Sequence, residues 1–382
     1  MKRIIWLLAL ALVSAGCSKE KDVDPPAELV DFAAQLDPAR VWSAKTGGGD
    51  EVLRLGLRPL VADDRVYVAG HGGDVQALEP GTGRSLWRVK TDLDLSGGPA
   101  SGEGIVVAGT AAGDVIALDA ATGAERWRVA VGGEVLAAPA IGGGLVVVRT
   151  VDGRLRGLRA ADGVEAWSYE EPVPRLTLRG NGGPVIDGDM VLAGLDNGKV
   201  VALALASGDL LWTATIAPSR GRTEIERLAD IDSPIRVIGE DVYVVGYQGR
   251  VAMLARESGQ IWWGREMSSH RGLAADAENL YVTTADSAVV ALRRRDGTEL
   301  WRHDRLLRRS LTAPALQEQV LVVGDFEGYL HWLDAATGEL LGRAKSGAGR
   351  ISNAPVPAGD LLLLQTDSGE VQAYRARPRK AG

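Results

Sequence analysis

The chain repeats one short pattern about every 40 residues. A glycine, once a serine, is followed after ten residues by a turn glycine, and in six of the seven copies a tryptophan comes four residues later. The copies are Gly73–Trp87, Gly113–Trp127, Gly153–Trp167, Gly198–Trp212, Gly249–Trp263, Ser287–Trp301 and Gly328–Gly342, the last without tryptophan. A period of this length predicts a solenoid or a propeller rather than an ordinary globular core.

Each repeat carries the signals of four short strands. Most repeats open with an X-Pro pair, as at Arg58-Pro59, and Gly272-Leu273 is the exception. A run rich in β-branched residues follows, such as residues 65–69, and then an alternating strand, a Thr-Gly or Asp-Gly turn and the strand that holds the tryptophan. The turn glycine allows positive φ and hence a tight hairpin. Because no helical pattern separates the repeats, each one is typical of a propeller blade.

The two ends of the chain give the number of blades. The last repeat opens at Ala354-Pro355 and stops before its tryptophan strand, while residues 40–46 form a fourth strand with no preceding three. Pairing these pieces completes an eighth blade and removes the open edges of the array. We therefore expect an all-β, eight-bladed β-propeller with four-stranded antiparallel blades over residues 39–376 and a C-terminal tail over residues 377–382. The tryptophans are expected to pack between neighbouring blades.

The amino terminus resembles the signal of a bacterial lipoprotein. Basic residues at positions 2–3 precede an apolar stretch over residues 4–13, too short to span a bilayer, and the small residues 14–16 precede Cys17. The resemblance implies that residues 1–16 are a signal peptide and that Cys17 is lipidated, with Ser18 favouring the outer membrane. Cys17 is the only cysteine, which excludes an intrachain disulfide. The polar residues 17–38 are expected to form a flexible tether carrying the lipidated cysteine.

Composition and motifs argue against chemistry on a bound substrate. The formal charge of −7 becomes −9 when Lys2 and Arg3 are removed with the leader, and an acidic protein disfavours nucleic acid as a partner. No nucleophile elbow and no constellation of acid, base and nucleophile is found. Four histidines lie in different repeats without metal-ligand spacing: His71, His270, His303 and His331. We expect no catalytic residues, no metal and no cofactor.

Three connections depart from the repeat. Most repeats pass from tryptophan to the next proline in 12 or 13 residues, but Trp167 to Pro184 takes 17, Trp212 to Pro234 takes 22 and Trp42 to Pro59 takes 17. In a propeller these connections emerge on one face, so the first two long loops should lie side by side on adjacent blades. Extra length on one face of a repeat protein usually marks the binding face.

The two long loops contain the segments 176–180 (LTLRG) and 223–232 (TEIERLADID), and two further segments stand out at 304–316 (DRLLRRSLTAPAL) and 324–332 (GDFEGYLHW). The loops resemble the signature loops of the BamB family, the lipoproteins of the outer-membrane β-barrel assembly machinery, and the two further segments match this family as well. The similarity extends over essentially the whole mature chain, including the lipoprotein signal and the blade count. It implies a non-enzymatic scaffold of the BAM complex, anchored in the outer membrane of a Gram-negative bacterium and facing the periplasm.

The resemblance also implies a docking site for a periplasmic POTRA domain of BamA, and through it contact with the other BAM subunits. It nominates Leu176, Leu178 and Arg179 in one loop and Asp230 and Asp232 in the other. Two leucines spaced by one residue can form an apolar anchor. Arg179 can bind a carboxylate, and the aspartates can meet a basic partner or hold Arg179 in place. The structural alternative is that the leucines pack over a blade edge while the aspartates cap turns.

Other functions stay open at the level of sequence. Exposed edge strands could pair with unfolded outer-membrane β-barrel substrates, because backbone hydrogen bonding tolerates many sequences. A dehydrogenase of the quinoprotein type, binding pyrroloquinoline quinone above the ring axis, shares the blade motif. The lone Cys17 and the scarcity of insertions in the blades disfavour it. A scaffold or sensor with another periplasmic partner is the third possibility.

Overall fold

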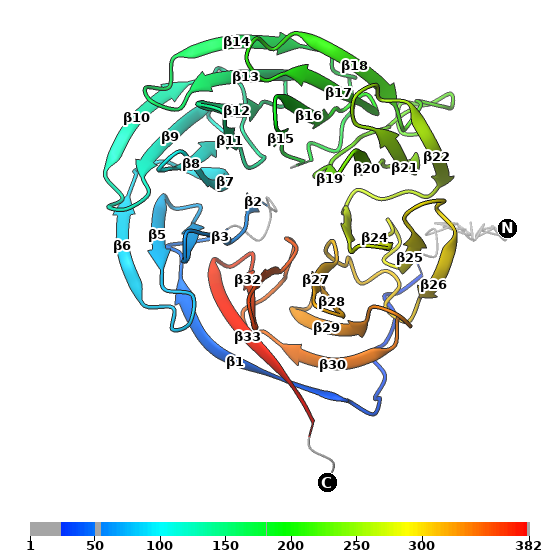
Figure 1. The fold of residues 1–382 in the computed structure, drawn as a ribbon. Helices are drawn as coiled ribbons and strands as arrows, with labels where there is room; N and C mark the ends of the chain where they lie inside the picture. The colour runs from blue at the N-terminus through cyan, green and yellow to red at the C-terminus, as the bar shows by residue number, and fades with distance from the viewer. Residues whose placement is uncertain (1–23, 50–54, 181, 380–382) are drawn as a thin grey trace, which may run out of the picture.

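The computed structural model describes residues 24–49, 55–180 and 182–379, which form a closed ring of eight blades (Figure 1). The predicted all-β, eight-bladed propeller is confirmed. The predicted signal peptide and Cys17 lie outside the described residues. Within the described ranges, no helix has the length and apolar character needed to cross a membrane.

Each blade has four antiparallel strands, of which the first faces the ring axis and the last lies outside (Figure 1). In blade two, the short strand β2 (Gly56–Leu57) adds to this sheet in parallel with its first strand. Blades one to four consist of β3 (Leu60–Ala62), β4 (Arg65–Ala69), β5 (Asp74–Leu78) and β6 (Ser85–Lys90); β7 (Leu95–Gly102), β8 (Ile105–Thr110), β9 (Asp114–Asp119) and β10 (Glu125–Ala130); β11 (Ala140–Gly142), β12 (Leu145–Arg149), β13 (Arg154–Arg159) and β14 (Glu165–Glu170); β15 (Val185–Asp187), β16 (Met190–Gly194), β17 (Lys199–Ala204) and β18 (Leu210–Thr215).

Blades five to eight continue the same order around the ring. They consist of β19 (Arg236–Ile238), β20 (Asp241–Val245), β21 (Arg250–Ala255) and β22 (Ile261–Glu266); β23 (Leu273–Ala275), β24 (Asn279–Thr283), β25 (Val289–Arg293) and β26 (Glu299–His303); β27 (Ala315–Gln317), β28 (Val320–Gly324), β29 (Tyr329–Asp334) and β30 (Leu340–Lys345); β31 (Val356–Ala358), β32 (Leu361–Gln365), β33 (Glu370–Pro378) and β1 (Leu36–Lys45). The second strands are buried along almost their whole length, which explains their apolar sequences.

The ring closes through the predicted overlap of the two chain ends. Strand β1 pairs antiparallel with β33, from Leu36 opposite Pro378 to Lys45 opposite Glu370. The first strand of the chain thus becomes the outer strand of the last blade (Figure 1). This pairing leaves no blade with a missing outer strand.

The repeated tryptophans pack between blades, as predicted. Each Nε1 atom donates to a backbone oxygen of the next blade over 2.8–3.1 Å, for Trp42, Trp87, Trp127, Trp167, Trp212, Trp263 and Trp301. The turn glycine of that next blade lies against the indole face, and a Cβ atom on Gly163 would come within 2.7 Å of Cε3 of Trp127. The repeat therefore keeps tryptophan and turn glycine together because one packs directly on the other.

The seventh repeat has Gly342 in place of tryptophan because β1 crosses the outside of blade seven at that point. A Cβ atom on Gly342 would lie 3.2 Å from both Cβ of Leu36 and Cγ of Pro38. The strand that closes the ring takes the space that an indole fills between the other blades.

Residues 24–35, part of the expected tether, lie along the outer surface near blade seven. Arg308 and Arg309 donate to the backbone oxygens of Pro25 and Ala27 over 2.8 and 3.0 Å. The guanidinium carbon of Arg343 lies 5.1 Å from the centre of the Phe32 ring, and Leu29 and Phe32 pack against the buried cluster of blades six and seven. This part of the segment is therefore held on the propeller by both polar and apolar contacts.

Candidate docking site

Two long loops meet on one rim of the ring. The first, residues 171–184, connects β14 to β15, and the second, residues 216–235, connects β18 to β19. The amide of Leu178 in the first loop donates to Oδ2 of Asp230 in the second over 2.5 Å. The prediction that the two loops are neighbours is confirmed by this contact.

The first loop presents apolar side chains to solvent. The exposed fractions of Leu176 and Leu178 are 40% and 37%, although leucine is usually buried. Arg179 adopts a φ of 53° and pairs with Glu134, a residue of the connection from β10 to β11. The two leucines and the arginine therefore form the outward face of this loop.

The second loop contains a short structured turn. The Thr223 hydroxyl accepts from the amide of Glu226 over 3.2 Å, and the Glu226 carboxylate accepts from the amide of Thr223 over 3.0 Å. This reciprocal pair is a capping box of the kind found at helix starts. Between its two residues lies Ile225, which is 71% exposed. The turn holds an apolar side chain outward on the same rim as Leu176 and Leu178, and Ile225 was not among the predicted site residues.

The two nominated aspartates lie beneath the loops. Asp230 is 0% exposed and Asp232 is 4% exposed. The expectation that they meet a basic partner or hold Arg179 is corrected by this burial and by the pairing of Arg179 with Glu134. Asp230 instead fixes the backbone of Leu178. A Cβ atom on Gly180 would lie 2.1 Å from Cγ of Asp232, so only glycine lets the first loop pass over that carboxylate.

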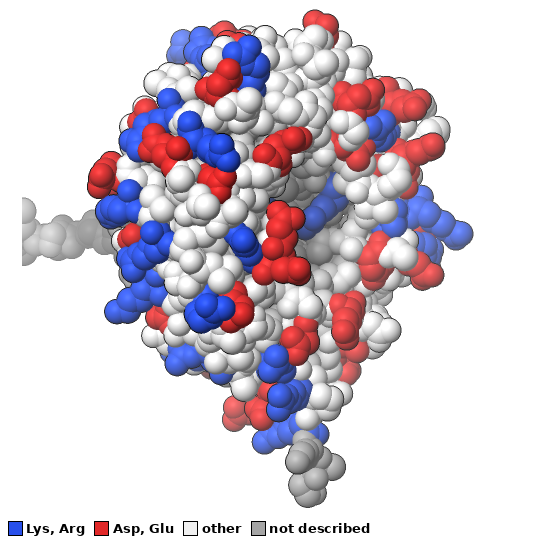
Figure 2. Space-filling model, turned by 60° about the vertical axis from the view of Figure 1, so that its left-hand side comes forward, with Lys and Arg blue, Asp and Glu red and all other residues white. Residues whose placement is uncertain are grey.

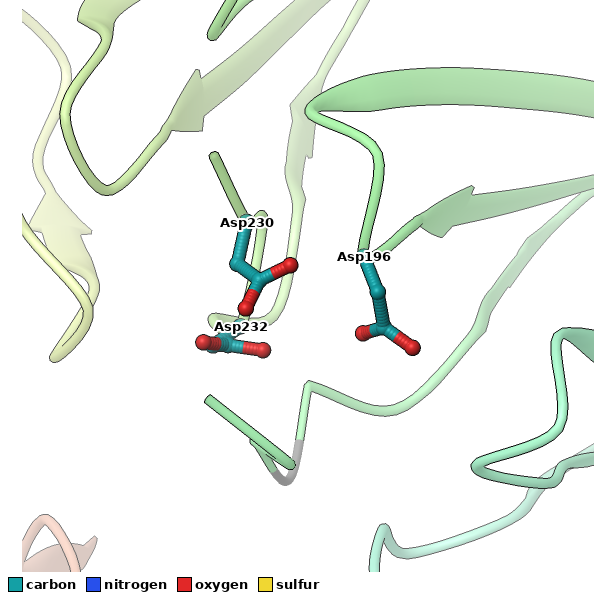
Figure 3. Close-up of side chains that lie close together, drawn as sticks. All are labelled: Asp196, Asp230 and Asp232. Atoms are coloured by element: carbon teal, nitrogen blue, oxygen red, sulfur yellow. The ribbon is translucent and has the colours of Figure 1, made fainter. Parts of the chain in front are cut away.

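A third aspartate completes a buried acidic cluster. Carboxylate oxygens of Asp196, Asp230 and Asp232 lie within 4.8 Å of one another (Figure 3). Arg149 at the end of β12 pairs with Asp196 and donates to the backbone oxygen of Gly182 over 3.0 Å. One guanidinium therefore connects the acidic cluster to the first loop as well.

The cluster holds more negative charge than Arg149 can neutralise. Burial, with a further contribution from Asp230, raises the pKa of Asp232 to about 8. Burial also raises the pKa of Asp230 to about 7, against the stabilising hydrogen bond from Leu178. Three carboxylates at this spacing could hold a cation, but Arg149 and bound protons can balance their charge without one. At neutral pH we assign a proton to Asp232.

Arg149 and Asp196 were not among the site residues predicted from the sequence, although Arg149 departs from the pattern of the repeat. At the equivalent position the other inner strands end in small or uncharged residues, such as Ala69, Gly194 and Val245. A charged residue at the end of an apolar strand could therefore have indicated a special role for Arg149. The sequence gives no such indication for Asp196, because aspartate is common in an Asp-Asn-Gly turn.

The sequence profile described as "Outer membrane protein assembly factor BamB" matches residues 28–91, 71–303 and 285–380. A curated protein with that same name from Pseudomonas aeruginosa is 49% identical over 372 residues, covering 97% of this chain and 98% of the relative. The chain belongs to the BamB family. The family resemblance expected from the sequence is thereby confirmed.

Solved structures agree with this assignment. The crystal structure of BamB from Moraxella catarrhalis has a TM-score of 0.81 and 30% identity, covering 89% of this chain and all of that chain. The quinohemoprotein alcohol dehydrogenase from Comamonas testosteroni has a TM-score of 0.69 but only 16% identity, covering 91% of this chain and 78% of its own. The likeness to the dehydrogenase shows a common propeller fold, whereas the BamB similarity shows the family.

Proposed function

We propose that this BamB family member is a non-enzymatic scaffold of the outer-membrane assembly machinery, and that its two long loops bind a POTRA domain of BamA. The proposed contact surface consists of Leu176, Leu178, Arg179 and Ile225. Asp230 and Asp232 belong to the site as buried supports of the first loop. The scaffold would assist delivery and insertion of outer-membrane β-barrel proteins, whose unfolded strands could pair with exposed blade edges.

The observation that supports this proposal most directly is that Leu178 combines a fixed backbone with an exposed side chain. Its backbone is fixed by a buried carboxylate, while its side chain stays 37% exposed. Fixing the backbone lowers the entropy lost when a partner binds, which favours an apolar anchor in this position. Leu176 and Ile225 extend the apolar surface, and Arg179 can exchange Glu134 for a carboxylate of the partner.

Co-purification with the periplasmic region of BamA tests the proposal. Leu178→Ala and Arg179→Ala should each reduce the recovery of BamA at least about tenfold, because an interface anchor typically contributes about 2 kcal/mol or more. Leu300→Ala is the matched control, since Leu300 is exposed on the outer strand β26 of blade six and belongs to neither loop. Unchanged recovery with both loop variants would remove the assigned site and favour another partner.

We also propose the location implied by the lipoprotein signal. Lipidation of Cys17 would anchor the chain in the outer membrane with the propeller in the periplasm. The family membership supports association with the outer membrane. Residues 24–35 would then connect the anchor to the outer surface near blade seven, where they are bound.

A further inference from the structure

The ring encloses an axial cavity of about 1160 Å³. Its wall consists mainly of the X-Pro openings and first strands of the blades, and Leu178 and Arg179 lie at its edge. Figure 2 shows a hollow in the molecule with Lys or Arg side chains inside it. The cavity is therefore accessible from outside and contains positive charge.

Two arginines extend into this cavity from opposite sides of the ring. Arg58 precedes β3 of blade one, and Arg236 begins β19 of blade five, four blades away in a ring of eight. Both residues are exposed to the solvent that fills the cavity. The surrounding protein lowers the pKa of both arginines by reducing their solvation, and repulsion by Arg236 lowers the pKa of Arg58 further. Within the described ranges neither guanidinium has an ion-pair or hydrogen-bond partner.

Both arginines depart from the repeat. At the position of Arg58, before the proline, the other blades have Gly98, Ala138, Gly183, Ser233, Gly272, Ala313 and Ala354. Arg236 lies opposite the third residue of the second strand, and at that position the other blades have Leu60, Ala100, Ala140, Val185, Ala274, Ala315 and Val356. The ring can therefore be built without charge at either position, and packing of the blades does not explain the two arginines.

The backbone at Arg58 is held by contacts that no other blade has. The short strand β2 (Gly56–Leu57) adds to blade two in parallel with β7, and the amide of Arg58 donates to Gly98 over 3.3 Å. From blade eight, the side chain of Asn353 donates to the backbone oxygens of Leu55 and Leu57 over 2.9 and 3.0 Å. These contacts of residues 55–58 hold the backbone that carries the Arg58 guanidinium at the cavity wall.

The carboxylates around the cavity do not neutralise this charge. Asp187 and Asp232 line it, but Asp187 pairs with Arg256, and burial raises the pKa of Asp232 to about 8. Arg179 lines the same cavity but pairs with Glu134. Arg58 and Arg236 therefore place positive charge in the axial cavity of a protein whose formal charge is −7.

We propose that Arg58 and Arg236 form a binding site for a small anion with two or more negative charges, of the phosphate or polycarboxylate class. Guanidinium groups bind the oxygens of both classes through paired N–H donors. Two such groups on opposite walls favour a ligand whose charge is divided between its ends. Leu178 and Arg179 of the docking surface lie at the edge of the same cavity, whereas Leu176 and Ile225 do not line it. A change at Leu176 therefore separates docking from anion binding.

Isothermal titration calorimetry of the purified protein at low salt tests this site, with pyrophosphate and citrate as the two probes. Arg58→Gln and Arg236→Gln should each weaken binding about tenfold or more, and the double variant should abolish it. Arg295→Gln is the control, because Arg295 is 81% exposed and pairs only with Asp296 among the described residues. Leu176→Ala should leave anion binding unchanged even if it prevents docking to BamA.

A stability measurement gives a second readout that does not need the ligand. Without an anion, the two guanidinium groups repel each other and lack partners, so either Gln variant should melt at the same temperature as the unaltered protein or higher. Pyrophosphate should raise the melting temperature of the unaltered protein and not that of the double variant. Absence of binding to both probes, equal binding by the double variant, or binding only to acidic peptides would overturn the proposal.

Discussion

The amide of Leu178 donates over 2.5 Å to the buried carboxylate of Asp230, a residue 52 positions further along the sequence, and thereby connects the two loops. The bond holds one end of the exposed segment 176–178 in place. In the proposed docking site, Asp230 therefore supports the exposed Leu178 from beneath the loop.

Replacing Asp230 tests this dependence directly. Asp230→Ala leaves the Leu178 amide without its acceptor, a change that costs about 1–3 kcal/mol when the group stays buried. We expect loss of BamA recovery with a folded propeller, and faster hydrogen exchange at Leu178. Asp230→Asn keeps an acceptor oxygen and should lose less. Asp189→Ala is the control, because Asp189 is exposed on the turn after β15. Full recovery of BamA by Asp230→Ala would contradict the supporting role.

The acidic cluster predicts a particular pH dependence of stability. The folded state raises the pKa of Asp232 from 3.8 to about 8, so it retains a proton that the unfolded chain releases. The contribution of Asp232 to the free energy of unfolding is fully present below about pH 4 and is lost as the pH rises toward about 8. Asp232→Asn cannot ionise, so its free energy of unfolding should fall less than that of the unaltered protein over this range.

Urea unfolding at several pH values measures this difference. Comparing the two proteins removes contributions from other groups, such as His303 and His331, whose pKa values are lowered by burial and which act in the opposite direction. Parallel curves for the two proteins between about pH 4 and pH 8 would show that Asp232 does not retain its proton in the fold.

The contact between turn glycine and tryptophan predicts a large effect of a single methyl group. Gly163→Ala combines a φ of 73° with a contact of 2.7 Å to Trp127, and should lower the free energy of unfolding by about 2–5 kcal/mol. Gly144→Ala in the same blade has a φ of 77° and no heavy atom within 4 Å, so about 1–2 kcal/mol is expected. If thermal or urea unfolding showed the same loss of stability for both variants, the positive φ alone would explain the effect and the contact with Trp127 would contribute nothing.

The proposed anchor is tested by membrane fractionation. Cys17→Ser removes the thiol that lipidation needs and should move the protein from the membrane fraction to the soluble periplasmic fraction. Ser18→Ala keeps Cys17 and should remain in the membrane fraction. If the Cys17→Ser protein stays with the membranes after a salt wash, attachment through the propeller surface replaces the lipid anchor as the explanation.

The repeat in the sequence was sufficient to predict the blades, their number and the closure of the ring. These features depend on local signals that recur, such as Gly163 and Trp127, and on counting the incomplete units at both ends. The neighbouring positions of the two long loops followed from the same geometry. Tryptophan packing was also predictable, since one slot recurs in seven blades.

The depth of individual side chains was not predictable from the repeat. Asp230 and Asp232 belong to a polar loop segment, and they lie buried beneath the first loop, which passes over Asp232 at Gly180. The exposure of Ile225 depends on a capping box inside an otherwise irregular loop. The repeat describes what the blades share, whereas these residues depend on contacts between two insertions.

The pairing of β1 with β33 has a consequence for the order in which the chain can fold. Residues 36–45 have no strand partner until residues 370–378 have been synthesised. A product that ends early leaves two unpaired β-edges, one at each end of an incomplete array, and such edges promote aggregation. Truncated chains should therefore aggregate or be degraded, and only a complete copy can close the ring.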